Sequence, residues 1–378
     1  MISPFIINDK NLFLDRYPVA QVNRSLQAWD AADEYLINYI TDNKLINSNS
    51  KILIMNDSFG ALTCNLSSFQ VYCINDSFVS QLGIKHNLEQ NGLYEDNITF
   101  LSSLEPIPDD IDLVLYKIPK SKSFLTEQLI QLKNNLLSDT TFIAADRAKE
   151  IHTSTLKQFE KYLGSTKTSL AVKKARLVFS QLDNIQQHKS PFPTVWQLEN
   201  TKFNLSNHAN VYARDKLDLG ARHFIKNLPK IQPEAKVIDL GCGNGVVGLT
   251  VLSLQPEAKL HFYDESHMAI ASAKSNIQQN LPSCVDNCSF HVNDCLSNVE
   301  GGSADIILCN PPFHQQTATT DHIAWQMFKD AHRVLKKGGE LRIIGNRQLG
   351  YHVKLKRLFG NEKLISSNDK FVIISAIK

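Results

Sequence analysis

The stretch KVIDLGCGNG, residues 236–245, decides the fold class of this chain. Its first five residues form an apolar run typical of a buried strand, and an apolar stretch at 246–254 predicts a helix behind it. Gly241, Gly243 and Gly245 permit a tight turn and a close approach of backbone to a ligand. A strand, a glycine turn and a helix in this order predict the ligand-binding corner of a parallel α/β sheet.

The glycine spacing separates two classes of ligand. A dinucleotide-binding loop needs glycines at its first, third and sixth positions, but the sixth position counted from Gly241 is Val246. The pattern G-x-G-x-G behind an acidic strand residue resembles the first motif of class I methyltransferases. In that family the loop lies against the methionine part of S-adenosylmethionine, and the resemblance implies that Asp239 helps to hold its amino group. The candidate cofactor residues here are Asp239, Gly241, Cys242, Gly243 and Gly245.

Two further acidic positions follow predicted strands in the expected order. Asp264 and Glu265 end the strand 260–263, and a carboxylate there can accept hydrogen bonds from both ribose hydroxyls. Enzymes that bind NAD place an acid similarly, so Asp264 alone does not discriminate. Asp294 and Cys295 follow the strand 289–292 and are expected beside the adenine, although turn chemistry explains a lone aspartate at a strand end equally well.

The sequence NPPF, residues 310–313, follows the predicted strand 305–309 and is the candidate catalytic loop. Pro311 and Pro312 lack N–H donors, so their neighbourhood offers carbonyl acceptors, and the Asn310 side-chain oxygen adds another. Two adjacent acceptors suit an amino group, and they would turn its lone pair toward an activated methyl group. Phe313 offers a face on which a base can stack. A proline pair that merely ends a strand is the alternative.

This loop resembles the Asn-Pro-Pro-Tyr/Phe motif of amino methyltransferases. Those enzymes act on exocyclic amines of adenine, cytosine or guanine, or on glutamine amides of proteins. The resemblance implies catalysis by residues Asn310, Pro311, Pro312 and Phe313, with Asn310 also near the cofactor.

The chain repeats its own layout. Residues 51–55 match 236–240, Gly60 then falls on Gly245, and 77–91 follow the course of 266–280. Strands and helices alternate in both halves, which predicts parallel sheets covered by helices. We therefore expect an α/β protein with two tandem class I methyltransferase domains that arose by duplication, each a Rossmann-like seven-stranded mixed sheet. The expected boundaries are a first domain at 1–185, a linker at 186–205 and a catalytic domain at 206–378.

The first copy has lost the chemistry of the second. Asn56 and Ser58 stand where Gly241 and Gly243 stand, Asn75 replaces Asp264, and residues 117–120 (KIPK) replace the catalytic loop. We predict that this degenerate copy is inactive and positions RNA. Its candidate phosphate-binding residues are Lys117, Lys120, Lys122, Lys173, Lys174 and Arg176, for which an ordinary solvated face is the alternative. Residues 25–40 predict an amphipathic helix, with Asp33 on its apolar stripe.

Composition narrows the class of protein. The chain has 378 residues and a formal net charge of +2, so charge alone argues little for nucleic acid. Its seven cysteines form no zinc-binding pattern, and no metal is expected. No basic segment followed by an apolar one begins the chain, and no apolar run approaches about 18 residues. We expect a cytoplasmic protein, a monomer without membrane contact.

Two longer stretches carry a more specific resemblance. Residues 208–220 (HANVYARDKLDLG), together with the loop at 310–316, resemble the bacterial ribosomal RNA guanine-N2 methyltransferases over the full chain. Residues 26–36 and 151–156 are similar to the large-subunit branch of that group. The resemblance implies methylation of guanine N2 in 23S ribosomal RNA, at guanine 1835, with free or partly assembled RNA as substrate. Tyr212 departs from the phenylalanine expected there.

Three other functions stay open from the sequence alone. A 16S ribosomal RNA guanine-N2 methyltransferase has the same loop, as does a DNA-adenine or protein-glutamine methyltransferase. The degenerate first copy argues against the second of these, the DNA-adenine or protein-glutamine methyltransferase. A non-catalytic RNA-binding ribosome assembly factor is the third, and the intact motifs of the second copy argue against it.

Overall fold

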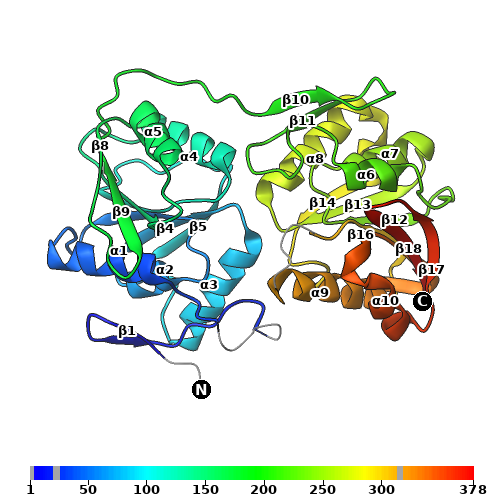
Figure 1. The fold of residues 1–378 in the computed structure, drawn as a ribbon, viewed down its shortest axis with the longest axis horizontal. Coiled ribbons are helices and arrows are strands. Elements are labelled where there is room, and N and C mark those ends of the chain that lie inside the picture. Colours follow the sequence, from blue (N-terminus) through cyan, green and yellow to red (C-terminus); the bar gives the residue numbers. More distant parts are fainter. Residues whose placement is uncertain (1–3, 20–25, 313–317) are drawn as a thin grey trace. The chain divides into compact units, whose positions relative to one another are not determined.

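The structure, a computed structural model, describes residues 4–19, 26–312 and 318–378. The chain divides into a first unit, Met1–Pro191, and a second unit, Phe192–Lys378. Each unit contains one seven-stranded sheet with helices on both faces (Figure 1). Within the described ranges no helix is long and apolar enough to cross a membrane.

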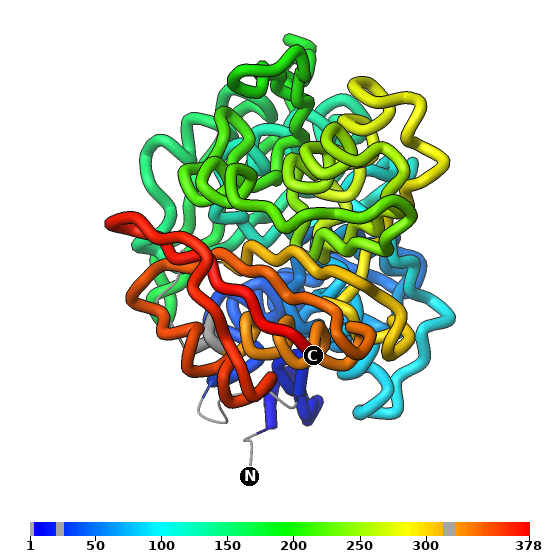
Figure 2. The backbone as a smooth tube through the Cα atoms, turned by 90° about the vertical axis from the view of Figure 1, so that its right-hand side faces the viewer, coloured from blue at the N-terminus to red at the C-terminus, as the bar shows by residue number. Residues whose placement is uncertain are grey.

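The second unit has the strand order β14-β13-β12-β15-β16-β18-β17. Its first five strands are parallel, and β18 pairs antiparallel with both β16 and β17. The red end of the tube in Figure 2 shows this last hairpin. Its elements are β10 (Thr194–Gln197), β11 (Asn204–Asn207), α6 (Leu219–Ile225), β12 (Lys236–Leu240), α7 (Val246–Leu254), β13 (Lys259–Asp264), α8 (His267–Asn280), β14 (Cys288–Val292), β15 (Ala304–Cys309), α9 (Ala318–Val334), β16 (Leu335–Asn346), α10 (Tyr351–Phe359), β17 (Lys363–Ser367) and β18 (Phe371–Ile377), with 3-10 turns at Pro282–Asn287 and Arg347–Leu349.

The first unit repeats this topology as β5-β4-β3-β6-β7-β9-β8. Its elements are β1 (Phe5–Ile7), β2 (Lys10–Leu12), α1 (Ala31–Asp42), β3 (Lys51–Met55), α2 (Ala61–Asn65), β4 (Gln70–Asn75), α3 (Phe78–Gln90), β5 (Ile98–Ser102), β6 (Leu113–Lys117), α4 (Lys122–Asn135), β7 (Thr141–Arg147), α5 (Thr153–Tyr162), β8 (Thr166–Thr168) and β9 (Ala175–Ser180). The identical strand order confirms the predicted fold class of two tandem Rossmann-like domains.

The sheet of the second unit separates two apolar layers. One core cluster joins the sheet to α6, α7 and α8, and the other joins it to α9 and α10, as Figure 1 also shows. In the first unit α1, α2 and α3 share one cluster, and α4 and α5 share the other. Strands buried on both faces explain why their sequences read as continuous apolar runs.

Strand register fixes which residues of the two units are equivalent. Met55 pairs with Tyr116, as Leu240 pairs with Cys309. Lys117 and Asn310, the next residues along the chain, therefore stand at equivalent positions. The replacement of the catalytic loop that the sequence suggested is a replacement at the same strand end.

The linker that we expected at 186–205 is only partly a linker. Strands β10 and β11 pair as an antiparallel hairpin within the second unit, and β1 and β2 form the corresponding hairpin of the first unit. The repeated unit therefore begins with its hairpin, before the point where our sequence alignment started. Strands β10 and β11 were not predicted because each has only four residues and both lie in or next to a polar, proline-containing stretch.

A buried asparagine attaches this hairpin to the second unit. Asn276 on α8 is fully buried, and its Nδ2 donates to the carbonyls of Ser206 (3.0 Å) and Asn244 (2.9 Å). Its Oδ1 accepts from the Ser206 N–H at 2.7 Å. Asn87 of the first unit makes the same set of bonds, to Asp15 and to the Phe59 carbonyl. One side chain thus holds both the hairpin and the glycine turn.

Replacing Asn276 by alanine should lower the free energy of unfolding of the second unit by about 3 kcal/mol, because one buried and two part-buried backbone groups lose their partners. Urea unfolding checks this value. Asn280→Ala is the matched control, because Asn280 makes the same pair of bonds to Asn204 at a half-buried site, and we expect a loss of about 1 kcal/mol. Equal losses in the two variants would contradict the role given to burial.

Candidate functional site

A cavity of about 500 Å³ opens at the carboxyl ends of β12, β13 and β15 in the second unit. Because parallel strands end at the same edge of a sheet, the residues that follow them come together there. Most of the predicted cofactor residues line this cavity: Asp239, Gly241, Cys242, Gly243, Asp264, Glu265, Cys295 and Asn310. Pro311 and Pro312 of the predicted catalytic loop line it as well.

The glycine turn has the conformation that its sequence predicts. Gly241, Gly243 and Gly245 have φ values of 71°, 55° and 76°, in the left-handed region that side chains with a Cβ rarely adopt. The N–H groups of Gly241 and Cys242 both donate to the Tyr263 carbonyl, at 2.8 and 3.1 Å. The turn is therefore fixed to the end of β13.

Two of these glycines serve different purposes. A Cβ on Gly243 would meet no atom within 4 Å, so this glycine keeps backbone open toward the cavity. A Cβ on Gly245 would lie 2.9 Å from the Ala273 Cβ. Gly245 lies outside the cavity lining, and its absent side chain allows α7 to pack against α8.

Asp239 is buried at the end of β12, and only 3% of its surface is exposed. Its Oδ2 accepts a hydrogen bond from the Gly248 N–H at 2.9 Å. Burial is the main cause that raises the pKa of this carboxyl, to about 7. The hydrogen bond from Gly248 opposes the rise, and the charge of the neighbouring Asp264 contributes to it. A carboxylate in such a place is costly by itself and gains from a cationic partner.

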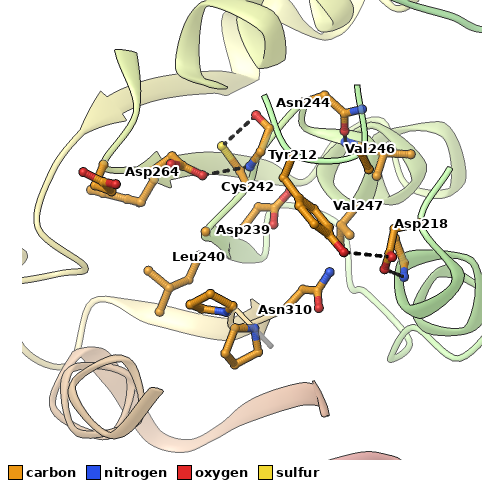
Figure 3. Close-up of a pocket in the computed structure, with 18 of the residues that line it drawn as sticks. Tyr212, Asp218, Asp239, Leu240, Cys242, Asn244, Val246, Val247, Asp264 and Asn310 are labelled. Atoms are coloured by element: carbon orange, nitrogen blue, oxygen red, sulfur yellow. Dashed lines mark hydrogen bonds between the residues drawn. The ribbon is translucent and has the colours of Figure 1, made fainter. Parts of the chain in front are cut away.

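Asp264 lies across the turn from Asp239. Its Oδ2 accepts from the Gly243 N–H at 2.9 Å, a bond drawn in Figure 3, and its Oδ1 accepts from the Ser266 N–H at 3.0 Å. These two bonds orient the carboxylate and tie the glycine turn to the start of α8.

Asp294 lies elsewhere than the sequence suggested. It is buried, its Oδ1 accepts from Gln326 Nε2 at 2.8 Å, and it does not line the cavity. Burial raises its pKa, against the Gln326 bond. Its neighbours Asn293 and Cys295 line the cavity instead. At this strand end the Asp294 side chain is joined to α9 by a hydrogen bond from Gln326, and its contact with the adenine stays a prediction.

Asn310 follows β15 and carries the most informative feature of the cavity. Its Oδ1 is buried and accepts no hydrogen bond within the described part of the chain. A buried acceptor without a partner costs about 1–3 kcal/mol, so it indicates a donor that binds there. Pro311 beside it is buried and Pro312 is exposed. Phe313 lies outside the described residues, as do His314 and Gln315.

One wall of the cavity consists of residues that were not predicted as site residues from the sequence. Asp218 caps α6, and its Oδ2 accepts from the Ala221 N–H at 3.1 Å. Its Oδ1 accepts from the Tyr212 hydroxyl at 3.0 Å (Figure 3). An aspartate directly before a helix is an N-cap signal, so the position of Asp218 at the start of α6 was predictable. The sequence did not indicate that its side chain lines the cavity. The other lining residues that were missed are Trp196, Ala213, Leu217, Ala221, Leu240, Asn244, Val246, Val247, Tyr263, Ile323 and Met327.

The equivalent strand end of the first unit is closed by a buried ion cluster. Lys117 Nζ lies 2.9 Å from Asp30 and 2.6 Å from Asp33, both at the start of α1. Burial disfavours the ammonium, but attraction to Asp33 and Asp30 outweighs it and raises the pKa of Lys117. Burial also raises the pKa of Asp33 to about 6, against the attraction of Lys117. This engagement removes Lys117 from the candidate phosphate contacts.

The other basic candidates of the first unit lie at or near the surface. Lys120, Lys122 and Lys174 are exposed, and Arg176 is half-buried. Lys173 is exposed and forms an ion pair with Glu34 at 2.6 Å.

Comparison with known families covers both units. The family model for the RLMG N-terminal domain matches residues 3–184, and that for the methyltransferase small domain matches residues 202–375. The ribosomal RNA large subunit methyltransferase G of Colwellia psychrerythraea is 65% identical, with 100% of each chain covered. The enzyme of the same name from Pseudoalteromonas translucida is 51% identical, over 98% of this chain and 97% of the relative.

A solved structure supports the same fold. A 16S rRNA N2-guanine methyltransferase of T. thermophilus, in complex with AdoMet and guanosine, superposes with a TM-score of 0.76 and 16% identity. The match covers 100% of this chain and 98% of that chain. At this identity the likeness concerns the fold of two tandem domains.

Proposed function

The chain belongs to the ribosomal RNA large subunit methyltransferase G family, and from that premise we propose that it methylates the exocyclic N2 of a guanine in 23S ribosomal RNA. The proposed position is guanine 1835. Its cofactor is S-adenosylmethionine. The observation that carries the choice of an amine is the buried Oδ1 of Asn310, a cavity-lining residue, which accepts no hydrogen bond from the described residues.

Asn310 and the proline pair supply the mechanism that we propose. S-adenosylmethionine, when bound, supplies a methyl group on a sulfonium, which makes it reactive without further activation. Asn310 Oδ1 and the Pro311 carbonyl would accept the two amine hydrogens and so direct the nitrogen lone pair toward that methyl group. The new N–C bond would replace the C–S bond, the thioether would be the leaving group, and the amine would release one proton to water. Holding reactants in this orientation is the main contribution required of the protein. Phe313 is the proposed stacking partner of the base.

The glycine turn and the strand-end acids form the proposed cofactor site. Gly241 and Gly243 offer backbone without side chains, Asp239 would hold the methionine amino group, and Asp264 would accept from the ribose hydroxyls. The open space beside Gly243 and the raised pKa of the buried Asp239 fit an extended ligand with a cationic end. Glu265, Asn293 and Cys295 complete the lining on the nucleoside side.

Cofactor affinity should depend on pH because of Asp239. Its pKa near 7 in the free protein lies above its ordinary value, so the carboxyl is largely neutral below pH 7 and charged above it. The ammonium of the ligand pairs with the charged form, so the Kd should fall as pH rises from 6 to 8, by about tenfold. Titration calorimetry checks this, and Asp239→Asn should bind weakly with a flat profile. A wild-type Kd that stays constant over this range would contradict the assignment.

We assign the holding of RNA to the first unit, which retains the fold but not the site. The exposed cations Lys120, Lys122 and Lys174 are the proposed phosphate contacts, with Lys173 and Arg176 beside them in sequence. Each phosphate contact adds about one unit to the salt dependence of binding. Reversing the charge of all three exposed lysines should weaken binding to a 23S fragment about 10-fold or more and reduce the salt slope by about three.

A matched triple reversal controls for total charge. Lys44, Lys149 and Lys157 are exposed lysines of the same unit, and their reversal should weaken RNA binding much less. Equal effects of the two triples would assign RNA attraction to net charge rather than to these positions.

One labelling experiment tests the substrate and the chemistry. The protein is incubated with methyl-labelled S-adenosylmethionine and, separately, with naked 23S RNA, 16S RNA, DNA, ribosomal protein and assembled large subunits. We expect N2-methylguanine in 23S RNA at one position, and the subunit arm compares free with assembled RNA. Absence of label in every 23S arm would overturn the proposal. We propose the cytoplasm, where ribosomes are made, as the site of action.

A further inference from the structure

The two units carry equivalent aspartates at the start of equivalent helices. Asp30 caps α1 and Asp218 caps α6, and in each case the side chain accepts hydrogen bonds from the first helical turn. Helix α1 packs on β7 and β9, and α6 packs on β16 and β18, which are the corresponding strands. The contacts of Asp30 in the first unit can therefore be compared directly with those of Asp218 in the second.

The contact between Lys117 and Asp30 shows that the capping aspartate lies within reach of a side chain at the strand end. In the first unit Lys117 occupies the position of Asn310, and its ammonium lies 2.9 Å from the Asp30 carboxylate. A cation that starts from this strand end therefore fills the space between strand and helix. In the second unit Asn310 is shorter and neutral, and both Asn310 and Asp218 line the cavity instead. In Figure 3 the amide nitrogen of Asn310 lies on the side of Tyr212 and Asp218, and its Oδ1 lies on the other side of the same amide group.

Among the described residues, two hydrogen bonds fix the Asp218 carboxylate and leave part of its acceptor capacity unused. One oxygen accepts from the Tyr212 hydroxyl and the other accepts from the Ala221 N–H. A carboxylate accepts only, and its two oxygens together offer about four acceptor positions. Asp218 therefore presents an oriented acceptor to the same cavity in which Asn310 presents its own.

The bases differ in what stands beside their amino groups. Guanine has the N1–H donor next to its N2 amine, whereas adenine and cytosine have a ring nitrogen with a lone pair next to theirs. An anionic acceptor beside the amine acceptor thus attracts guanine and repels the other two. Resting on the function proposed above, we propose that Asp218 determines base specificity by accepting the N1–H of the target guanine while Asn310 holds its N2 amine. Tyr212 positions the Asp218 carboxylate for this contact.

The test combines one amino-acid substitution in the protein with one base substitution in the RNA. 23S RNA is assembled by ligation with either guanine or 2-aminopurine at the methylated position. 2-Aminopurine keeps the amine, but its N1 is an acceptor. Wild-type protein should prefer guanine by about 100-fold or more in kcat/KM, since a site built to accept a hydrogen bond rejects an analogue without the donor. Asp218→Asn retains a helix-capping oxygen and gains an amide donor, so it should remain folded.

We expect the preference to cross over in Asp218→Asn. Its kcat/KM for guanine RNA should fall about 10- to 100-fold, and its activity on 2-aminopurine RNA should match or exceed that of the wild type. The Kd for S-adenosylmethionine serves as a check on folding and should change less than about threefold. Asp215→Asn, at an exposed aspartate three residues away, is the control and should leave both substrates unaffected.

The outcomes separate this inference from the function on which it rests. An equal loss on both RNAs in Asp218→Asn, or wild-type protein that methylates both equally, overturns the role of Asp218 while the methyltransferase assignment stands. Wild-type protein that puts no methyl group on guanine N2 overturns the proposed function and this inference together.

Discussion

Asn310→Ala should lower kcat for methyl transfer by at least about 100-fold while the Kd for S-adenosylmethionine changes less than about tenfold. Loss of one oriented polar group that acts on the reacting centre has effects of this size. The Oδ1 of Asn310 is buried and has no partner within the described chain, so its removal breaks no hydrogen bond to a described residue. The loss should therefore appear in chemistry rather than in stability.

Single-turnover kinetics with 23S RNA measures this effect, and two variants bracket it. Asn310→Asp keeps an acceptor at the same place and should retain more activity than alanine. Asn298→Ala removes an exposed asparagine of the same unit and should behave as wild type. Label transfer by Asn310→Ala at the wild-type rate would rule out the amine-holding mechanism and leave the proline pair as a mere strand terminator.

The corner at residues 236–245 was predictable because every local cause pointed the same way. The strand is apolar, the three glycines have positive φ, and the helix begins where the glycines end. Such agreement between propensity, pattern and turn chemistry is what makes a segment readable from sequence. The position of Asn310 directly after a strand was predictable for the same reason, because the apolar run ends at Cys309 and two prolines follow Asn310.

Asp218 and Asp294 show that the local sequence does not reveal which tertiary contacts a residue makes. Both are aspartates at element boundaries, and the sequence around each offers the same turn chemistry. Only the tertiary structure shows that Asp218 faces the cavity and that Asp294 accepts from Gln326 on α9. Which of two similar carboxylates meets a ligand depends on contacts between residues far apart in the chain.

Helix α1 gives a second instance of this limit. The amphipathic pattern over 25–40 predicted a helix with Asp33 on its apolar stripe, and the described helix spans Ala31–Asp42. Asp33 is indeed buried, but it is an ion-pair partner of Lys117, which is 84 residues away in the chain. Periodicity identifies which face is buried, and it says nothing of what a charged residue on that face meets there.

That ion cluster leads to a large expected effect on stability. Replacing Lys117 by methionine should lower the free energy of unfolding of the first unit by about 3 kcal/mol, because it leaves the buried Asp33 and the half-buried Asp30 carboxylates without a countercharge. Lys173→Met is the matched control. Lys173 also pairs at 2.6 Å with an acid of α1, Glu34, but it is exposed, so a loss below about 1 kcal/mol is expected.

Trp29 permits the measurement, because it is the one tryptophan of the first unit and is buried beside the cluster. With Trp196 and Trp325 replaced by phenylalanine, urea unfolding followed by fluorescence reports on that unit. The pKa of Asp33 is raised above its ordinary value, so the folded state binds its proton more tightly than the unfolded state does. The deficit of Lys117→Met should therefore shrink as pH falls from 8 to 5, since protonation removes the uncompensated charge. Equal losses in Lys117→Met and Lys173→Met, or a deficit that does not change with pH, would mean that the cluster occupies this strand end of the first unit without stabilising the unit.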